Sequence, residues 1–183
     1  AALDVARTHL GPQVFPAVAT PLAAVLGDFA AGPEGRSALR MYCRTTRPIY
    51  ITDICSVKES ANVRKMAVGE VFEITGGPQN DATMNVGRVQ GRAVCDGVAG
   101  WVTLTSNQAG AKPFLAPGGT VLEVKAPTPL RSAALAGENG KGGEGLRELA
   151  RGEIVTMVDW EPAPQSGGAS FVRIRAQDGV VGW

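Results

Sequence analysis

Two hexapeptides, Asp-Gly-Val-Ala-Gly-Trp at residues 96–101 and Asp-Gly-Val-Val-Gly-Trp at residues 178–183, are the clearest structural signal in this sequence of 183 residues. Each is preceded by a second repeated segment, which reads Val-Arg-Lys-Met-Ala-Val-Gly-Glu-Val at residues 63–71 and Leu-Arg-Glu-Leu-Ala-Arg-Gly-Glu-Ile at residues 146–154. Self-similarity at a fixed spacing is the signature of a duplicated structural unit.

The repeat divides the chain into three parts. The offset between the copies is 83 residues at the Gly-Glu dipeptides and 82 at the hexapeptides, so the second copy lacks one residue just before its hexapeptide. Upstream, Pro48-Ile49 matches Pro129-Leu130 at an offset of 81. We therefore predict a first unit at residues 41–115 and a second at 116–183, preceded by a different segment at 1–40.

Within each copy the residue pattern is that of short β-strands. Strands rich in branched residues are predicted at 71–74, 86–94, 100–104, 154–158 and 171–176. The Gly- and Pro-rich segments 76–81 and 161–168 are predicted to be loops. Each Asp-Gly dipeptide predicts a hairpin with a type I′ turn, which needs positive φ at both central residues. About five short strands in each copy are typical of a small barrel.

The first 40 residues have a helical pattern instead. Thr20 and Pro21 are suited to the start of a helix, and Gly32-Pro33 is suited to its end. One face of this helix is apolar and carries Leu22, Val25, Leu26 and Phe29. We expect this face to pack on its own barrel or to dock into a larger partner. A helix of about eleven residues spans only about 16 Å, which is too short to cross a membrane.

The repeated pattern resembles SH3-like barrels of the bacterial SH3 type, as two tandem copies, on the Gly-Glu turn, the basic strand and the terminal Asp-Gly-x-x-Gly-Trp. The residue sequence of the first copy further resembles SH3-like modules common in predicted dinoflagellate proteins. The resemblance implies a mainly β fold of two tandem barrels after a short helical segment, and a role in binding, anchoring or scaffolding. The second copy ends at Trp183, where the first continues with Val102-Thr103-Leu104, so its last strand is expected to be truncated or the chain to be a fragment.

Composition and residue spacing argue against several classes of activity. There are 18 Lys and Arg against 17 Asp and Glu, so the basic excess that a nucleic-acid binder needs is missing. The three cysteines, Cys43, Cys55 and Cys95, and the single His9 have neither disulfide-framework nor zinc-site spacing. The run Gly-Glu-Asn-Gly-Lys-Gly-Gly-Glu-Gly at 137–145 lacks the residues of a phosphate-binding loop. We therefore predict no catalytic residues, no metal site and no cofactor.

The expected function is that of a non-catalytic accessory or scaffolding subunit that binds other proteins of a large assembly. We expect this assembly to be an organellar membrane complex such as a photosystem, with the chain peripheral to the chloroplast thylakoid and not spanning it. The alternative is a ligand-targeting module of a longer protein, which recognises a cell-wall component or another peptide. The predicted partner contacts are the four apolar helix residues Leu22, Val25, Leu26 and Phe29, together with Arg88, Arg92 and Trp101.

Overall fold

The computed structural model describes residues 40–134, 143–163 and 170–183. The chain divides into two compact units: unit 1 comprises the described residues up to Val94 with Val98–Gly119, and unit 2 comprises Cys95–Gly97 with Thr120–Trp183. Every regular element in the described part of the chain is a β-strand, which confirms the mainly β class. The predicted helix within residues 1–40 lies outside the described residues. No helix with the length and hydropathy to cross a membrane occurs among those residues that are described.

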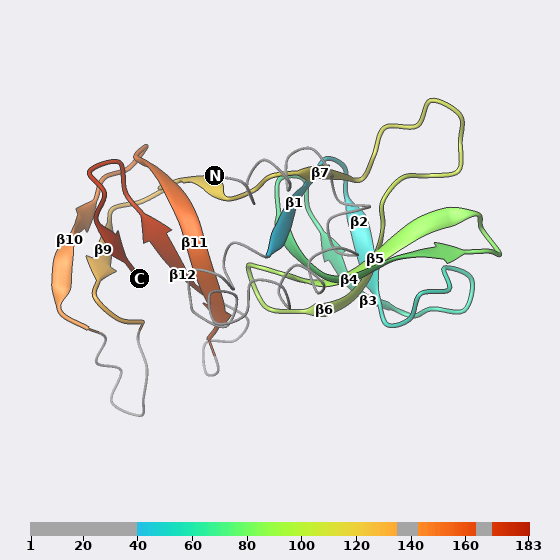
Figure 1. The fold of residues 1–183 in the computed structure, drawn as a ribbon, viewed down its shortest axis with the longest axis horizontal. Coiled ribbons are helices and arrows are strands. Elements are labelled where there is room, and N and C mark those ends of the chain that lie inside the picture. The colour runs from blue at the N-terminus through green and yellow to red at the C-terminus, as the bar shows by residue number, and fades with distance from the viewer. Residues whose placement is uncertain (1–39, 135–142, 164–169) are drawn as a thin grey trace, which may run out of the picture. The chain divides into compact units, whose positions relative to one another are not determined.

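Unit 1 contains one antiparallel sheet of seven strands in the order β3-β2-β6-β5-β4-β1-β7 (Figure 1). Its strands are β1 Met41–Thr45, β2 Ile49–Thr52, β3 Asn62–Met66, β4 Val71–Asp81, β5 Val86–Ala93, β6 Ala99–Thr103 and β7 Leu115–Pro117. Because β7 pairs with β1, the first unit continues beyond residue 115, where we predicted its end.

Unit 2 contains a four-stranded sheet in the order β13-β12-β11-β8 and the pair β10-β9. Its strands are β8 Val121–Glu123, β9 Thr128–Arg131, β10 Gly145–Leu149, β11 Ile154–Pro162, β12 Ser170–Arg175 and β13 Val181–Gly182. The main chains of Arg131 and Trp183 exchange two hydrogen bonds of 2.8 Å. These bonds hold β9 beside the end of β13.

Strand pairing in unit 2 repeats that in unit 1. Ile51 lies opposite Arg64 in unit 1, and Leu130 lies opposite Arg147 in unit 2. Since the two arginines are 83 positions apart, the equivalent strands before them are offset by 79 residues. The offset of 81 that we predicted from Pro48-Ile49 is therefore wrong, because Leu130 is the counterpart of Ile51 rather than of Ile49.

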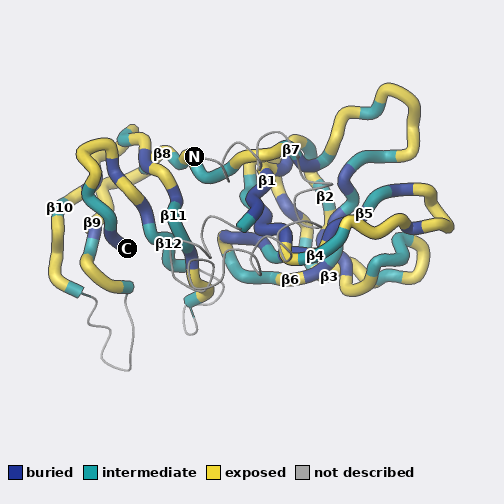
Figure 2. The backbone as a smooth tube through the Cα atoms, in the orientation of Figure 1, coloured by how far each residue is buried: buried dark blue, intermediate teal, exposed yellow. Residues whose placement is uncertain are grey.

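Apolar side chains from the strands form a separate core in each unit, and Figure 2 shows the buried positions along the chain. The larger core, in unit 1, comprises Met41, Cys43, Ile51, Met66, Phe72, Ile74, Val89, Ala93, Val102, Leu104 and Leu115. The core of unit 2 comprises Leu130, Leu149, Val155, Ile174 and Ala176. Burial of apolar area is the main stabilising term in folding. The smaller core therefore gives unit 2 less hydrophobic stabilisation than unit 1.

At one pair of core positions, on neighbouring strands, the two units carry residues of different sizes. A Cβ atom on Gly91 would lie 2.5 Å from the Phe72 ring and 2.1 Å from the carbonyl oxygen of Glu73, so only glycine fits beneath this ring. In unit 2 the equivalent residues are Val155 and Ile174, and both are buried. The smaller residue on one strand is compensated by the larger residue on its neighbour, as close packing requires. The two units therefore fill the same volume at these positions with different residues.

The second glycine of each hexapeptide is required by a close approach of two strands. A Cβ on Gly100 would lie 2.4 Å from the carbonyl oxygen of Thr52, and a Cβ on Gly182 would lie 2.6 Å from that of Arg131. Thr52 and Arg131 are equivalent residues on β2 and β9. This contact explains why glycine recurs at both positions.

Both Asp-Gly dipeptides lie in hairpin loops, but the predicted type I′ turn is wrong. Among the described residues, φ is positive at Gly97 (74°) and Gly179 (87°) and not at the aspartates before them. The loops comprise residues 94–97 between β5 and β6 and residues 177–179 between β12 and β13, and each is closed by a main-chain hydrogen bond of 2.9 Å. Loops of three or four residues with one left-handed residue suit such hairpins. The residue missing from the second copy is therefore a loop residue.

The predicted loop at residues 76–81 is also wrong, because β4 continues through it. Gly76 pairs with Gln90 and Gln79 pairs with Arg88, so the two residues between Gly76 and Gln79 form an irregularity within the ladder. Gly and Pro inside a strand mark a bulge as readily as a loop. Sequence alone did not distinguish the two.

Substitution of Gly100 by Ala should destabilise the protein by about 1–3 kcal/mol, because the added methyl group collides with the backbone of β2. Urea denaturation followed by circular dichroism measures this change. Gly145→Ala is the matched control, since a Cβ there meets nothing within 4 Å. Equal midpoints for the two variants would contradict the close approach.

Candidate binding site

The residues that we predicted as partner contacts fall into two groups, those outside the described residues and those on β5 and β6 of unit 1. Leu22, Val25, Leu26 and Phe29 lie outside the described residues. Arg92 is partly exposed, and its Nε atom lies 2.9 Å from Oε2 of the buried Glu73. Trp101 is half-buried on β6, opposite Thr52 on β2. The structure does not bring Arg88, Arg92 and Trp101 together on an exposed face.

Arg88 is buried, with 1% of its surface exposed, so our prediction that it contacts a partner is wrong. Its guanidinium donates hydrogen bonds to Oγ1 of Thr52 at 2.5 Å, to the carbonyl oxygen of Trp101 at 2.9 Å and to that of Cys55 at 3.2 Å. Desolvation lowers the pKa of Arg88 below its ordinary value. The side chain joins β5, β6 and the segment after β2 inside unit 1, which the strand pattern of the sequence did not reveal.

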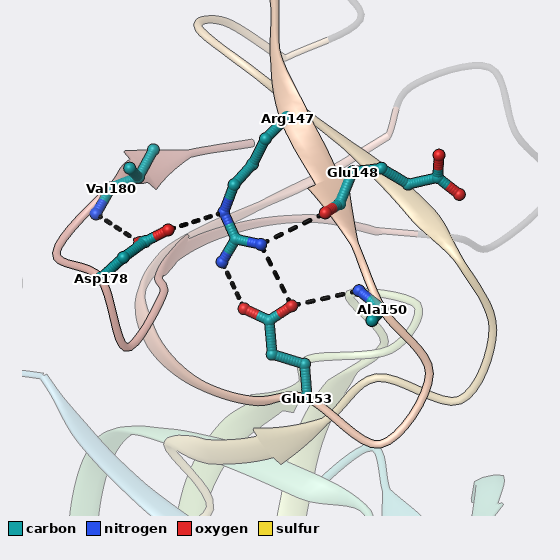
Figure 3. Close-up of polar contacts among 6 residues, drawn as sticks. All are labelled: Arg147, Glu148, Ala150, Glu153, Asp178 and Val180. Atoms are coloured by element: carbon teal, nitrogen blue, oxygen red, sulfur yellow. Dashed lines mark hydrogen bonds and ion pairs between the residues drawn. The ribbon is translucent and has the colours of Figure 1, made fainter.

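A recurring Arg–Glu contact, which we call the clasp, fixes the turn before β4 and before β11. In unit 1, Nη2 of Arg64 lies 2.6 Å from Oε2 of Glu70, and the N–H of Ala67 donates to the other carboxylate oxygen at 2.7 Å. In unit 2, Arg147 makes a two-point contact with Glu153 (Figure 3). Two-point contacts between guanidinium and carboxylate are strong and directional. The clasp accounts for the recurring Arg and Glu of both repeats.

In unit 2 the clasp also reaches the hexapeptide. Nε of Arg147 lies 3.0 Å from Oδ2 of Asp178, whose other carboxylate oxygen accepts the N–H of Val180 at 3.0 Å (Figure 3). The N–H of Ala150 donates to Glu153 at 3.1 Å. The hydrogen bonds from Arg147 and then Ala150 hold the pKa of Glu153 below its ordinary value of 4.5. The two repeated segments of the second copy therefore meet at one arginine.

Each unit exposes one branched apolar side chain at the same place, immediately before the clasp arginine. On β3, Arg64 pairs with Ile51 and Asn62 pairs with Thr52, so Val63 is the extra residue of a β-bulge. Leu146 is the extra residue at the equivalent position of β10. Val63 is 51% exposed and Leu146 is 44% exposed. A bulge re-aims a side chain, and here it directs an apolar one into solvent in both units.

The strands that carry these two residues are edge strands. Among the described residues, β3 pairs with β2 alone and β10 pairs with β9 alone. In unit 1, Tyr50 on β2 is also exposed, at 44%, and the Nζ atom of Lys65 lies 5.6 Å from the centre of its ring. We call Val63 and Leu146, with the edge strands that carry them, the edge sites. Sequence reasoning missed them because the bulge is not visible in the residue pattern, although both residues lie in the repeated segments.

Unit 2 additionally holds a cavity of about 440 Å³. Its lining is mainly apolar and includes Leu122, Leu130, Val155, Phe171, Ile174 and Trp183. Leu122 and Val155, the counterparts of the core residues Cys43 and Phe72 of unit 1, are among its walls. Phe171 stands at the position that Arg88 has in unit 1.

The described residues offer little for catalysis. The buried thiol of Cys43 has its pKa raised by desolvation to about 12, which is the opposite of what a nucleophile needs. No cluster of three or more His, Cys, Asp or Glu side chains that could hold a metal ion occurs in the described part of the chain.

Comparison with known proteins identifies no family for this chain. No family model matches, and no curated protein matches. Among solved structures, NlpC1 and NlpC2 from Trichomonas vaginalis are each similar over 78% of this chain, with 13% identity and TM-scores of 0.30 and 0.32. The chain covers only 42% and 44% of their lengths. At these TM-scores the likeness supports no inference about fold or activity.

Replacement of Glu153 by Gln should lower the free energy of unfolding at pH 7, because the clasp loses its charge. In the native protein the lowered pKa of Glu153 contributes stability that is complete above pH 4.5 and is lost as the pH falls below it. The difference between wild type and Glu153→Gln should therefore shrink below pH 4.5. Urea titrations between pH 7 and pH 3 measure it.

Glu148→Gln provides the control for this pH experiment. Glu148 is exposed on β10, and only its main-chain carbonyl contacts Arg147, at 3.2 Å. This variant should follow the wild-type pH curve. If Glu153→Gln did the same, the clasp would contribute nothing to stability.

Proposed function

We propose that this chain is a non-catalytic accessory subunit of two tandem SH3-like units that binds other proteins through two equivalent edge sites. The observation that carries the proposal is the recurrence of an exposed branched residue at the same bulge, at Val63 and at Leu146. Exposed apolar residues scattered singly need no explanation. An exposed apolar residue that recurs at one position in two units, while other residues differ between them, does need an explanation.

Two equivalent sites on one chain favour binding to an assembly rather than to an isolated small molecule. When both sites engage one partner, the second contact is intramolecular, and the overall affinity exceeds that of either site by orders of magnitude. The apolar side chain gives each site its contact area, while the clasp arginine next to it is held by its glutamate. The clasp therefore keeps each edge site in one conformation, which lowers the entropic cost of binding.

The proposed assembly is an organellar membrane complex, with a photosystem in the chloroplast thylakoid as the specific prediction. Neither the strands nor the comparisons bear on this point, so it stays a prediction from the resemblance to dinoflagellate modules. The alternative, a targeting module for a cell-wall component or another peptide, is favoured by one observation, the apolar cavity of unit 2.

Val63→Asp and Leu146→Asp test the edge sites in the full chain. Each single variant should reduce co-sedimentation of the tagged chain with its native assembly at least tenfold, because the avidity of two sites is lost. The double variant should sediment as the free chain. Density-gradient sedimentation of solubilised native membranes, with immunodetection, measures the distribution.

Val68→Asp is the matched control, because Val68 is an exposed apolar residue of the same unit that lies outside the edge strand, at 61% exposure. This variant should sediment as wild type does. Co-sedimentation of the double variant at the wild-type level would refute the edge sites. A wild-type chain that sediments only as a free monomer would refute the accessory-subunit role itself.

A further inference from the structure

Each unit exposes a cross-strand pair of side chains at the same place on its edge hairpin. In unit 1, Tyr50 on β2 lies opposite Lys65 on β3, and both are exposed. In unit 2, Pro129 on β9 lies opposite Glu148 on β10, and both are likewise exposed. Lys65 and Glu148 each follow the clasp arginine directly, so the two pairs are equivalent. We call them the exposed pairs.

The two exposed pairs are complementary in chemistry and in spacing. The Nζ atom of Lys65 lies 5.6 Å from the centre of the Tyr50 ring, so unit 1 presents a cation beside an aromatic ring. Unit 2 presents a carboxylate beside a proline ring at the same two positions. Carboxylates pair with ammonium groups, and proline rings pack on aromatic side chains. Residues directly opposite in an antiparallel ladder have Cβ atoms about 4.5–5.5 Å apart, so both contacts can form together.

The charges of the two pairs are not compensated within the units. Neither Lys65 nor Glu148 forms an ion pair among the described residues, in contrast to the clasp residues beside them. Figure 3 shows the carboxylate of Glu148 directed away from the clasp. An exposed cation and an exposed anion are therefore available at equivalent positions of the two units.

The same difference in sign extends to the whole units. The described residues of unit 1 carry nine Lys and Arg against five Asp and Glu, which is a net charge of +4. Those of unit 2 carry six against eight, which is a net charge of −2. Opposite net charges steer two surfaces toward each other in solution. Unit 1 of one copy is therefore attracted to unit 2 of another.

We propose that copies of this chain bind each other, with the exposed pair of unit 1 in one copy against the exposed pair of unit 2 in the next. The Tyr50 ring packs on Pro129. The ammonium group of Lys65 pairs with the carboxylate of Glu148. Because the contact joins two different surfaces, it closes into a ring of copies or extends as a filament. The proposal goes beyond the proposed function, since it needs neither of the two bulge residues of the edge sites.

Sedimentation velocity of the purified full chain tests this self-association. The weight-average sedimentation coefficient should rise with protein concentration. Association should weaken about tenfold when the salt concentration is raised from about 0.01 M to about 0.15 M, because the Debye length falls from about 30 Å to about 8 Å. A coefficient that stays constant with protein concentration at low salt would overturn the proposal.

Charge reversal identifies the contact. Lys65→Glu and Glu148→Lys should each lower the association constant at least tenfold, because like charges then face each other. An equimolar mixture of the two variants should restore association, because each reversed group meets an opposite charge on the other variant. A variant that had lost its fold would not be rescued in this way. Failure of the mixture to associate, when wild type does, would show that the exposed pairs are not in contact.

Lys58→Glu is the matched control, because Lys58 is an exposed lysine of unit 1 outside the exposed pair. It changes the net charge as much as Lys65→Glu does and should associate as wild type does. If it lowered association equally, net charge alone would account for binding and the proposal would be wrong.

Failure of this proposal is distinguishable from failure of the edge sites, because the experiment uses only the purified chain. A purified chain that stays monomeric, while the native chain co-sediments with its assembly, would overturn self-association alone. A purified chain that associates through the exposed pairs would support it, whatever the result for Val63→Asp/Leu146→Asp in native membranes.

Discussion

Each unit depends on one glutamate carboxylate at the turn that joins an edge strand to the long central strand. The carboxylate accepts a hydrogen bond from the N–H of the alanine that follows the edge strand, Ala67 or Ala150. It also pairs with the arginine in the middle of that strand. The turn itself needs a left-handed residue, which Gly69 and Gly152 provide at φ of 88° and 85°. Glycine adopts this conformation without strain but does not hold it. The carboxylate supplies the missing constraint, and in unit 2 the same arginine extends it to the hairpin loop through Asp178.

The two units share their strand pairing but differ in the side chains that fill their interiors. The ring of Phe72 covers Gly91 in unit 1, whereas Val155 and Ile174 share the same volume in unit 2. Arg88 is buried among carbonyl oxygens in unit 1, and its counterpart Phe171 lines an apolar cavity. A buried cation is tolerated where hydrogen bonds replace its hydration, and in unit 1 the main chain provides them. Backbone geometry is therefore conserved between the units more strictly than core composition.

The sequence predicted the duplication, the mainly β class and the strands that follow the Gly-Glu turns, because these depend on local residue pattern. It did not predict the continuation of β4 through Gly76, since glycine and proline suit a bulge as well as a loop. The burial of Arg88 was missed because an alternating strand with arginine on one face indicates a solvated face, and only the tertiary contacts with Thr52 and Trp101 reverse it. The edge sites depend on a bulge, which is a property of pairing between strands and leaves no mark on either strand alone.

Comparison of the two units separates residues that maintain the fold from residues that we propose to bind a partner. Arg147, Glu153 and Gly182 recur with their counterparts, and each is explained by a contact inside its own unit. Recurrence alone is therefore no sign of a partner contact, and the second glycine of each hexapeptide recurs for a structural reason. Val63 and Leu146 differ, because they recur in character and position while contacting solvent. A surface that both units keep is therefore the basis on which we propose one shared partner chemistry for the two units.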